Sequence, residues 1–487
     1  MQQSKGINNL SEIKKTCINS DLLASSFARG LKEFNLSHIN SILSKAKTKG
    51  VSCSITFQPL FILPFISILN VWGLMKSGYA TIAASKKDVF YTFLNNPLID
   101  WRRIVSLFAR QYFRIVQTKS VGDSGDGVSF MVLDDTLLAK TGKAMEFIGK
   151  VFDHCTHSYQ LGMKVLTLGL WDGTSFIPLD FSIHNEPGKK GLRGMSKDQI
   201  DAQFTKERAD GSPGRLRADE VSACKIVTGL SMIKTAISKK IIPQYVLADS
   251  WFISDGFFKG ISKIAARAKK TIGVIGLMKS NRQVLVNGKL VLASQLPVMH
   301  ASKVKACRKH KCNYLVFDVI YKGTNLRLYF VKMNGQENWK MLVSTNQKLT
   351  FTKAMNYYQV RWSIEVFFKD AKQSLHLGKC QSTDFDAQVA SISIAFTNYM
   401  VLSLTKRFES YETIGEMYRA FKDNMLQQNI MQRIWKLIAG LLSTIISEIG
   451  ADIDAIIGKI INSDSFMQDL NNIFCFQMLE ALPEKKG

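Results

Sequence analysis

The segment NYYQVRWSIEVFFKDAKQSL, residues 356–375, carries two kinds of side chain at helical spacing. At roughly 100° per residue its polar side chains fall within an arc of about 80° and form one stripe, made of Tyr358, Arg361, Glu365, Lys369 and Lys372. Its apolar side chains fall on the neighbouring arc, which a helix buries: Val360, Ile364, Phe367, Ala371 and Leu375. The stripe is either a solvated surface with ion pairs or a functional face, and the rest of the chain must separate the two.

The composition points to a polyanionic partner. The chain has 487 residues, enough for about two to four domains and a large core. Lys and Arg number 64 against 39 Asp and Glu, which gives a net charge of +25. Because the basic residues are spread along the whole chain, we expect an extended surface for nucleic acid, with an affinity that falls steeply as salt rises.

Several protein classes are disfavoured. Eight scattered cysteines in a large chain are typical of reduced thiols in a cytosolic protein. Cys307, His310 and Cys312 have irregular spacing for zinc and no second cysteine pair nearby. The N-terminus lacks an apolar signal core. Residues 55–75 are apolar enough for a membrane span, but two amide side chains and two prolines favour a buried helix or helix pair. We therefore expect a cytoplasmic, nucleoid-associated protein with no membrane partner.

Strand and helix patterns alternate through the middle of the chain. Apolar strand patterns are predicted at 128–134, ending in acid, and at 161–173 and 174–183, which read as an antiparallel pair. A polar, Gly-rich stretch, 184–220, predicts a flexible surface excursion. A helix, a strand ending at Asp249, another helix and another strand then follow, at 221–241, 245–249, from Ser254, and 271–278.

We assign five regions from these patterns. They are a helical region for DNA binding or plain packing, 1–120; the first part of an α/β core, 121–280; a β-rich insertion, 281–346; the core helix bearing Glu365, 347–390; and a helical C-terminal region, 391–487, for dimerisation or for completing the core. Without the excursion and the insertion, the order of elements is the ribonuclease H-like layout, with helical regions on either side of the core.

That layout brings acids together from distant parts of the chain. Its first strand lies beside its fourth, so Asp134 and Asp249 become neighbours, and the last helix can add Glu365 at the same point. Three such carboxylates repel one another unless a cation lies between them. Hard oxygen ligands favour Mg²⁺ or Mn²⁺, and two such ions can drive an in-line phosphodiester displacement. Strand alternation allows only one of Asp134 and Asp135 to enter such a site.

The sequence resembles the DDE transposases of bacterial insertion sequences, in the branch with Tyr, two residues, Arg, three residues, Glu, six residues and Lys. YQVRWSIEVFFKDAK fits this signature at Tyr358, Arg361, Glu365 and Lys372. VLDDTLLAK fits the first acid motif, Asp, any residue, Thr or Ser, and YVLADSWF fits the second, with Asp249. The first motif favours Asp134 over Asp135. The resemblance covers roughly residues 128–390.

The resemblance implies a transposase that binds terminal inverted repeats, cuts double-stranded DNA and joins the freed 3′-hydroxyls to target DNA, as a homodimer on two synapsed ends. It also implies that Tyr358, Arg361 and Lys372 hold the terminal phosphate; Lys369 lies on the stripe outside the signature. Trp339 either holds a flipped base or packs in the insertion. Trp251 and Trp362 are expected in the core. The alternatives are a ribonuclease H-like nuclease without joining activity and a non-catalytic transposase-derived DNA-binding protein.

Overall fold

A computed structural model describes residues 31–419, except 32, 48, 78–84, 120–126 and 409–412, together with residue 422. Residues 29–420 form one compact unit, and the fold below is that of this unit. The most amphipathic part of the predicted C-terminal region, residues 432–461, lies outside the described residues.

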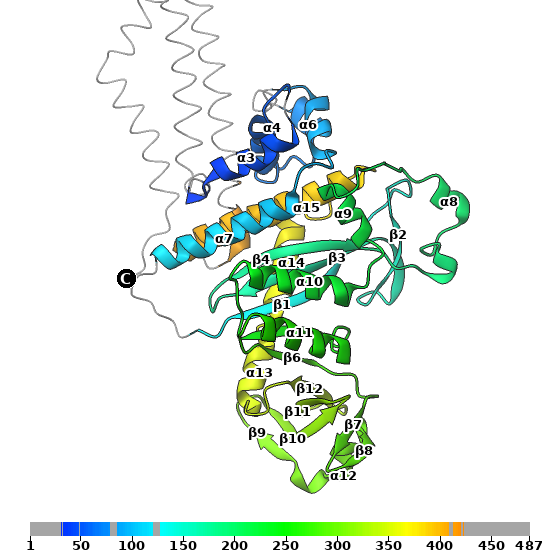
Figure 1. Cartoon of the computed structure of the whole chain (residues 1–487), viewed down its shortest axis with the longest axis vertical. Coiled ribbons are helices and arrows are strands. Elements are labelled where there is room, and N and C mark those ends of the chain that lie inside the picture. The colour runs from blue at the N-terminus through cyan, green and yellow to red at the C-terminus, as the bar shows by residue number, and fades with distance from the viewer. Residues whose placement is uncertain are drawn as a thin grey trace, which may run out of the picture. The chain divides into compact units, whose positions relative to one another are not determined.

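The unit mixes helices and strands (Figure 1). Its helices are α3 Leu36–Ala46, α4 Cys53–Ile62, α5 Val71–Lys76, α6 Lys87–Leu94, α7 Trp101–Lys119, α8 Lys197–Asp201, α9 Pro213–Glu220, α10 Lys225–Ser238, α11 Asp255–Arg267, α12 Leu296–Met299, α13 Phe351–Gln359, α14 Trp362–Ser374 and α15 Phe385–Phe408, with short 3₁₀ helices η2 Lys189–Gly191, η3 Ala293–Gln295 and η4 Ala301–Lys303. Its strands are β1 Phe130–Ala139, β2 Gly149–Asp153, β3 Ser158–Trp171, β4 Phe176–His184, β5 Tyr245–Ala248, β6 Gly273–Leu277, β7 Gln283–Val286, β8 Lys289–Leu292, β9 Lys305–Cys307, β10 Cys312–Tyr321, β11 Thr324–Met333 and β12 Lys340–Ser344.

One sheet organises the unit. Its order is β2-β3-β1-β5-β6-β12-β11-β10-β7-β8, with β4 on β3 and β9 on β10. β1 is antiparallel to β3 and parallel to β5, and β5 is parallel to β6. The predicted antiparallel pairing of 161–173 with 174–183 is confirmed by β3 and β4. The predicted contact between the strand of Asp134 and the strand before Asp249 is confirmed by β1 and β5.

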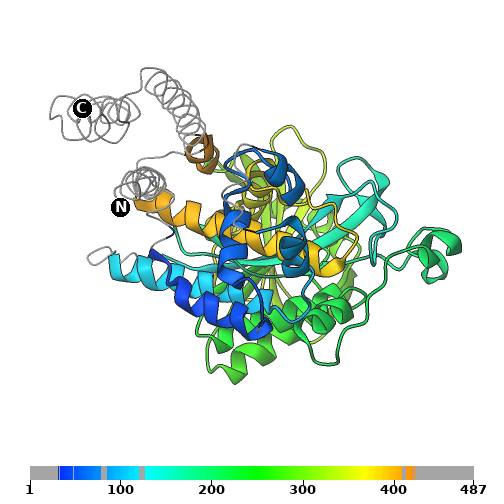
Figure 2. The ribbon, with the colours of Figure 1, turned by 90° about the horizontal axis from the view of Figure 1, so that it is seen from above.

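Helices cover the sheet and its edge at β4. Every residue of β4 is buried, although its ladder neighbour is β3 alone, because α7, α9 and α15 pack on it. α7 and α15 run side by side there (Figures 1 and 2). α15 is long and apolar enough to cross a membrane by length and composition, but it is 94% buried within the described part of the chain, as a core helix is. The edge of the sheet is thus closed to further strand pairing.

Two predicted boundaries were wrong. The first strand does not end at its acid, because β1 continues through Asp134 to Ala139, paired along its whole length with β3. The 356–375 segment is not one helix, because α13 ends at Gln359 and α14 begins at Trp362. At the junction the backbone bonds run to the third residue back, as from the Arg361 N–H to the Tyr358 carbonyl, 3.0 Å.

The stretch 184–220 is not a flexible excursion. It contains α8 and α9, and Arg208 within it is 8% exposed. Arg208 Nη1 and Nη2 donate to the two carboxylate oxygens of Glu146 at 2.8 and 2.6 Å, and its Nε donates to Asp386 Oδ2 at 3.1 Å. Buried ion pairs with satisfied hydrogen bonds fix this stretch to the start of α15. Arg208 is one of the charged residues that suggested a surface loop, but it belongs to a buried network of ion pairs.

Residues 281–346 contain β7 to β12, and these strands extend the central sheet. β12 pairs antiparallel with β6, with Leu342 opposite Leu277. β11 then pairs with β12, and β10 with β11. At the other end of the unit, residues 55–75 form α4, a turn and the start of α5, which confirms the expected helix pair.

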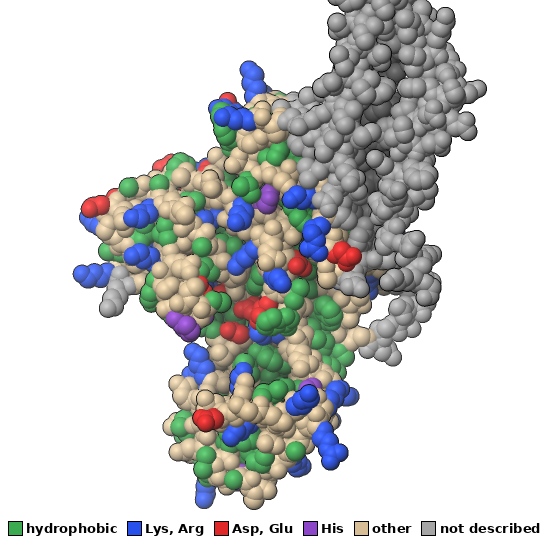
Figure 3. All heavy atoms as spheres, turned by 180° about the vertical axis from the view of Figure 1, so that it is seen from behind, with side chains coloured by type: hydrophobic (Ala, Val, Ile, Leu, Met, Phe, Trp, Pro, Cys, Tyr) green, Lys and Arg blue, Asp and Glu red, His purple; other side chains and the backbone are tan. Residues whose placement is uncertain are grey.

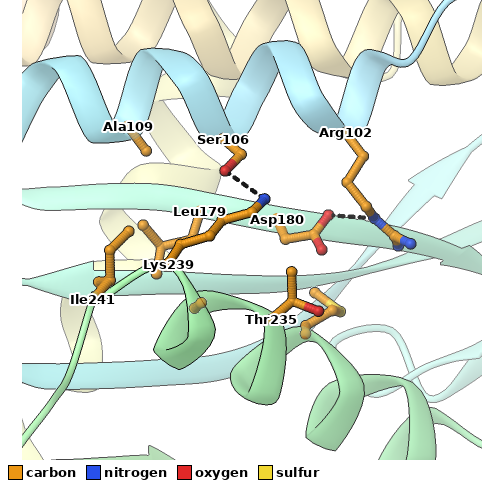
Figure 4. Close-up of a pocket in the computed structure, with 10 residues that line it drawn as sticks. Arg102, Ser106, Ala109, Leu179, Asp180, Thr235, Lys239 and Ile241 are labelled. Carbon is orange, nitrogen blue, oxygen red and sulfur yellow. Dashed lines mark hydrogen bonds and ion pairs between the residues drawn. The ribbon is translucent and has the colours of Figure 1, made fainter.

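A small cavity of about 10 Å³ lies between α7, β4 and α10 (Figure 4). Lys239 Nζ donates to Ser106 Oγ across it at 2.8 Å, and Arg102 Nε donates to Asp180 Oδ1 at 3.0 Å. A space of this size holds about one water molecule. The cavity therefore belongs to the packing of α7 and α10 on β4, and the candidate site lies elsewhere.

Candidate active site

The sheet register places two acids on neighbouring strands. In the parallel pairing of β1 with β5, Leu133 is opposite Ala248, which is the last residue of β5. Asp134 and Asp249 are the next residues on each strand. Asp249 begins the turn after β5, where its Oδ1 accepts a hydrogen bond from the Trp251 N–H at 2.8 Å. The two carboxylates thus stand at the same level of the sheet, although they are far apart in sequence.

The first turn of α14 adds the third acid through a shared arginine. Arg361 Nη1 donates to Asp134 Oδ2 at 2.8 Å, and Arg361 Nη2 donates to Glu365 Oε1 at 2.6 Å. The pair of Arg361 with Asp134 is largely shielded, since their side chains are 18% and 17% exposed, whereas the side chain of Glu365 is 33% exposed. Glu365 reaches this point because α14 packs on β1, with Ile364, Phe367 and Ala371 buried as the helical pattern predicted.

Asp134 lies in an environment that disfavours its charged form. Burial, followed by repulsion from Asp249, raises the pKa of Asp134 to about 7, against the attraction of Arg361. Arg361 therefore only partly offsets the burial and the repulsion that disfavour the charged form of this acid. On the face of the unit opposite to that of Figure 1, Asp and Glu side chains gather where the strand-rich insertion meets the core (Figure 3).

Two further signature residues face the same strand. Lys372 Nζ donates to Thr136 Oγ1 at 2.7 Å, which joins the last turn of α14 to the same face of β1 as Asp134. The guanidinium of Arg361 lies 5.7 Å from the centroid of the Tyr358 ring. Burial raises the pKa of Tyr358 to about 12, so this phenol stays protonated as a hydrogen-bond donor. Of the five stripe residues, Lys369 alone is exposed.

Asp135 points to the opposite face of β1. It forms an ion pair with Lys225, the first residue of α10, and the distance from Lys225 Nζ to Asp135 Oδ2 is 2.7 Å. The adjacent acids Asp134 and Asp135 thus have different partners on different faces. Lys225 could not be predicted as the partner of Asp135, because a lysine at a helix start gives no local signal for the strand that it will meet.

The comparison with known families bears on this site. Residues 227–401 match the family described as Transposase DDE domain. This match supports a DDE transposase. The matched range contains Asp249, Glu365 and the full signature, and it begins after Asp134. No curated protein matches the chain.

Two tryptophans near Asp249 and Glu365 in the sequence lie at the surface. Trp251 and Trp362 are 45% and 62% exposed, so their predicted place in the core was wrong. Trp251 follows Asp249 in the turn after β5, with Lys225 Nζ 5.1 Å from its ring centroid. Trp362 begins α14 on the side away from the buried Ile364 and Phe367. Size and hydrophobicity suggested burial, but the helix and turn orientations place both rings outward.

Trp339 of the insertion is half-buried in the segment just before β12, outside any strand. The start of β12 lies beside the end of β6, since the Met278 N–H donates to the Met341 carbonyl at 2.8 Å. Because β5 and β6 are parallel, Trp339 is on the sheet edge where Asp249 also follows its strand. Among the described residues, Trp339 lies at that edge and makes no hydrogen bond to Asp134, Asp249 or Glu365.

The acids suit a divalent cation, the kind of ion that DDE transposases generally use. Within the described ranges, no three His, Cys, Asp or Glu side chains already form a metal-holding group. However, a cationic guanidinium links Asp134 to Glu365, and Asp249 repels Asp134. Among the described residues, Arg361 Nε is buried and has no hydrogen-bond partner. The set of oxygen donors matches the preference of Mg²⁺ and Mn²⁺.

Proposed function

We propose that the chain is a DNA transposase of a bacterial insertion sequence, with a ribonuclease H-like core and Asp134, Asp249 and Glu365 as its catalytic acids. The strand order β4-β3-β1-β5-β6, with β1 and β5 parallel, supports this core. The observation that carries the proposal is the meeting of Asp134 and Glu365 on one guanidinium, beside the strand that leads to Asp249. Asp134 and Glu365 thereby share one cationic partner, and Asp249 follows the strand next to that of Asp134.

The three acids would hold Mg²⁺ or Mn²⁺, because hard oxygen ligands select these ions. Two bound ions would supply an activated water or 3′-hydroxyl and stabilise the leaving oxygen. The chain itself orients the DNA. Arg361 offers a planar fork to phosphate oxygens, Lys372 a point charge, and the protonated Tyr358 a hydrogen-bond donor. We assign Trp339, at the same sheet edge, to contact with a base of the DNA.

The biological context follows from this chemistry. The protein would bind the terminal inverted repeats of its own element, cut there and join the freed 3′-hydroxyls to target DNA. Two ends must be held together, so a homodimer on DNA is expected. The net charge of +25 supports a DNA partner, and the work would take place in the bacterial cytoplasm at the nucleoid.

Strand joining with purified full-length protein tests the proposal. The DNA is a pre-cleaved duplex ending in the inverted repeat found beside the coding region, mixed with supercoiled plasmid and Mg²⁺. We expect joined products with the wild type and none with D134N, D249N or E365Q. D135N is the matched control, because Asp135 is the neighbouring acid on the other face of β1, and we expect it to keep most of the joining.

Each other outcome points to a defined rival. Hydrolysis of the plasmid without joined products supports a ribonuclease H-like nuclease. DNA binding without any Mg²⁺-dependent reaction supports a non-catalytic, transposase-derived protein. Loss of joining in D135N with retention in D134N would move the first acid by one residue and overturn the assignment of Asp134.

A further inference from the structure

Arg361 holds the same two acids that a divalent cation needs. Its two terminal nitrogens make charge-assisted hydrogen bonds to Asp134 Oδ2 and Glu365 Oε1, at 2.8 and 2.6 Å. The other oxygen of Asp134, Oδ1, already accepts the Asp135 N–H at 2.8 Å. Both oxygens of Asp134 thus accept a hydrogen bond, Oδ1 from a backbone N–H and Oδ2 from the side chain of Arg361.

A metal ion and this guanidinium therefore compete. A cation that coordinates Asp134 Oδ2 and Glu365 Oε1 takes the lone pairs that Arg361 uses, and its two positive charges repel a guanidinium within a few ångströms. The long arginine side chain can leave its partners without moving α14, since rotation about its own bonds is enough. The acids can stay on β1 and α14 while the arginine moves.

We propose that Arg361 is an internal counter-ion of the metal-free site, which a divalent cation displaces, and that displacement releases its guanidinium to bind a DNA phosphate. The inference rests on the proposed function, because it takes Asp134 and Glu365 as metal ligands. The positive charge of Arg361 then has two roles, one before the metal binds and one after it. In the first it neutralises the acids, and in the second it binds the substrate.

This exchange predicts coupling between two ligands. Metal binding frees the phosphate-binding group, so a bound cation raises the affinity for DNA through Arg361. By linkage, bound DNA raises the affinity for the cation by the same factor. Lys372 gives a contrast within the same site, because its Nζ is bonded to the Thr136 hydroxyl and not to an acid.

Calorimetric titration of the metal-free protein with Mn²⁺ tests the first role. We expect R361A to bind Mn²⁺ about tenfold more tightly than the wild type, a difference of about 1.4 kcal/mol, because the cation no longer has to displace the guanidinium from the two acids. R361K keeps the positive charge but cannot make both guanidinium hydrogen bonds, so we expect its Mn²⁺ affinity to increase less than that of R361A. K372A is the matched control for removing a nearby positive charge, and we expect a change of less than about threefold.

Fluorescence anisotropy with a labelled duplex tests the second role. The duplex carries the inverted repeat and lacks the terminal 3′-hydroxyl, so it cannot be joined. We expect saturating Mn²⁺ to raise the DNA affinity of the wild type and of K372A, and to raise that of R361A much less. Thermal unfolding of each metal-free variant checks that it is folded, and R361Q replaces R361A if the alanine variant is not.

The outcomes separate the inference from the proposed function. Wild-type protein that binds no Mn²⁺ overturns the metal site and with it the proposed chemistry. Wild-type protein that binds Mn²⁺, with R361A or R361Q at equal or weaker affinity, overturns the counter-ion role alone. An equal Mn²⁺ effect on DNA affinity in wild type and R361A overturns the release of the guanidinium.

Discussion

At the scale of single residues, strand alternation makes two adjacent acids different. Asp134 faces α14 and is paired with Arg361, whereas Asp135 faces α10 and is paired with Lys225. Asp134 also lies near Asp249, and burial together with that acid raises its pKa to about 7. The two adjacent acids thus lie in different electrostatic environments.

The raised pKa of Asp134 predicts how stability depends on pH in metal-free protein. The native state keeps a proton that the unfolded chain, with a pKa of 3.8, has lost. The stability that this group contributes is therefore complete below about pH 4 and is lost as pH rises through about 7. We expect the free energy of unfolding of wild type, relative to D134N, to fall across that interval, as measured by urea unfolding with a chelator present. Parallel curves for the two proteins would contradict this.

The local sequence pattern predicted which residues of α13 and α14 belong to the candidate site, but it did not predict which side chains they contact. The signature spacing predicted Tyr358, Arg361, Glu365 and Lys372 on one face, and the structure directs all four toward β1 or each other. It could not predict that Arg361 would bind the acids themselves. That contact depends on β1, which is more than two hundred residues away. The exposure of Trp251 and Trp362 was not predicted for the same reason, because tertiary packing decides which side chains are exposed.

At the scale of elements, a glycine fixes the level of Asp249. Gly276 of β6 lies beside Ala248, the residue before Asp249. A Cβ at Gly276 would be 2.6 Å from the Ala248 carbonyl oxygen and 2.5 Å from Ile253 Cδ1. The carbonyl belongs to the backbone and cannot rotate away, so the end of β5 must shift.

We therefore expect G276A to lower the free energy of unfolding by about 1–3 kcal/mol, as overpacking does, and to weaken Mn²⁺ binding by moving Asp249. G256A is the control, since a Cβ at Gly256 in α11 would meet nothing within 4 Å, and its stability should be unchanged or slightly higher. Urea unfolding and calorimetry measure both effects. Equal Mn²⁺ affinity in G276A and G256A would show that β5 tolerates the added methyl group.

The junction between α13 and α14 shows what periodicity resolves. A period of 3.6 residues predicted the buried arc, and Ile364, Phe367, Ala371 and Leu375 are buried. It did not predict the tighter turn at Val360 and Arg361, which separates α13 on β6 from α14 on β1. Element order and type were therefore more predictable than element ends.

At the scale of the whole molecule, an internal ion network fixes the stretch between β4 and α10. We expect R208A to lower the free energy of unfolding by about 3–5 kcal/mol, because it removes the guanidinium that pairs with buried Glu146 and leaves buried Asp386 with Lys206 as its ion-pair partner. R215A is the matched control, since Arg215 pairs with Asp219 at the surface with 46% of its side chain exposed; its cost should be about 0–1 kcal/mol. Urea unfolding compares the two. Similar costs would mean that the network contributes little.

The charge of the chain predicts the salt dependence of its DNA binding. Six to ten neutralised phosphates would make the affinity fall by about 10³–10⁵ between 50 and 200 mM salt. Anisotropy titrations at several salt concentrations measure the slope of log affinity against log salt. A flat slope would mean that the net charge of +25 does not face DNA.

The pairing of β6 with β12 has a consequence for changes in chain length. Because Leu277 is opposite Leu342, the chain leaves the core and returns to it at adjoining points. Residues 278–341 are then one long hairpin connection, and the entropy of closing such a connection grows only slowly with its length. Shortening or lengthening its outer loops would therefore change the closure entropy little and would leave the ends of β6 and β12 side by side.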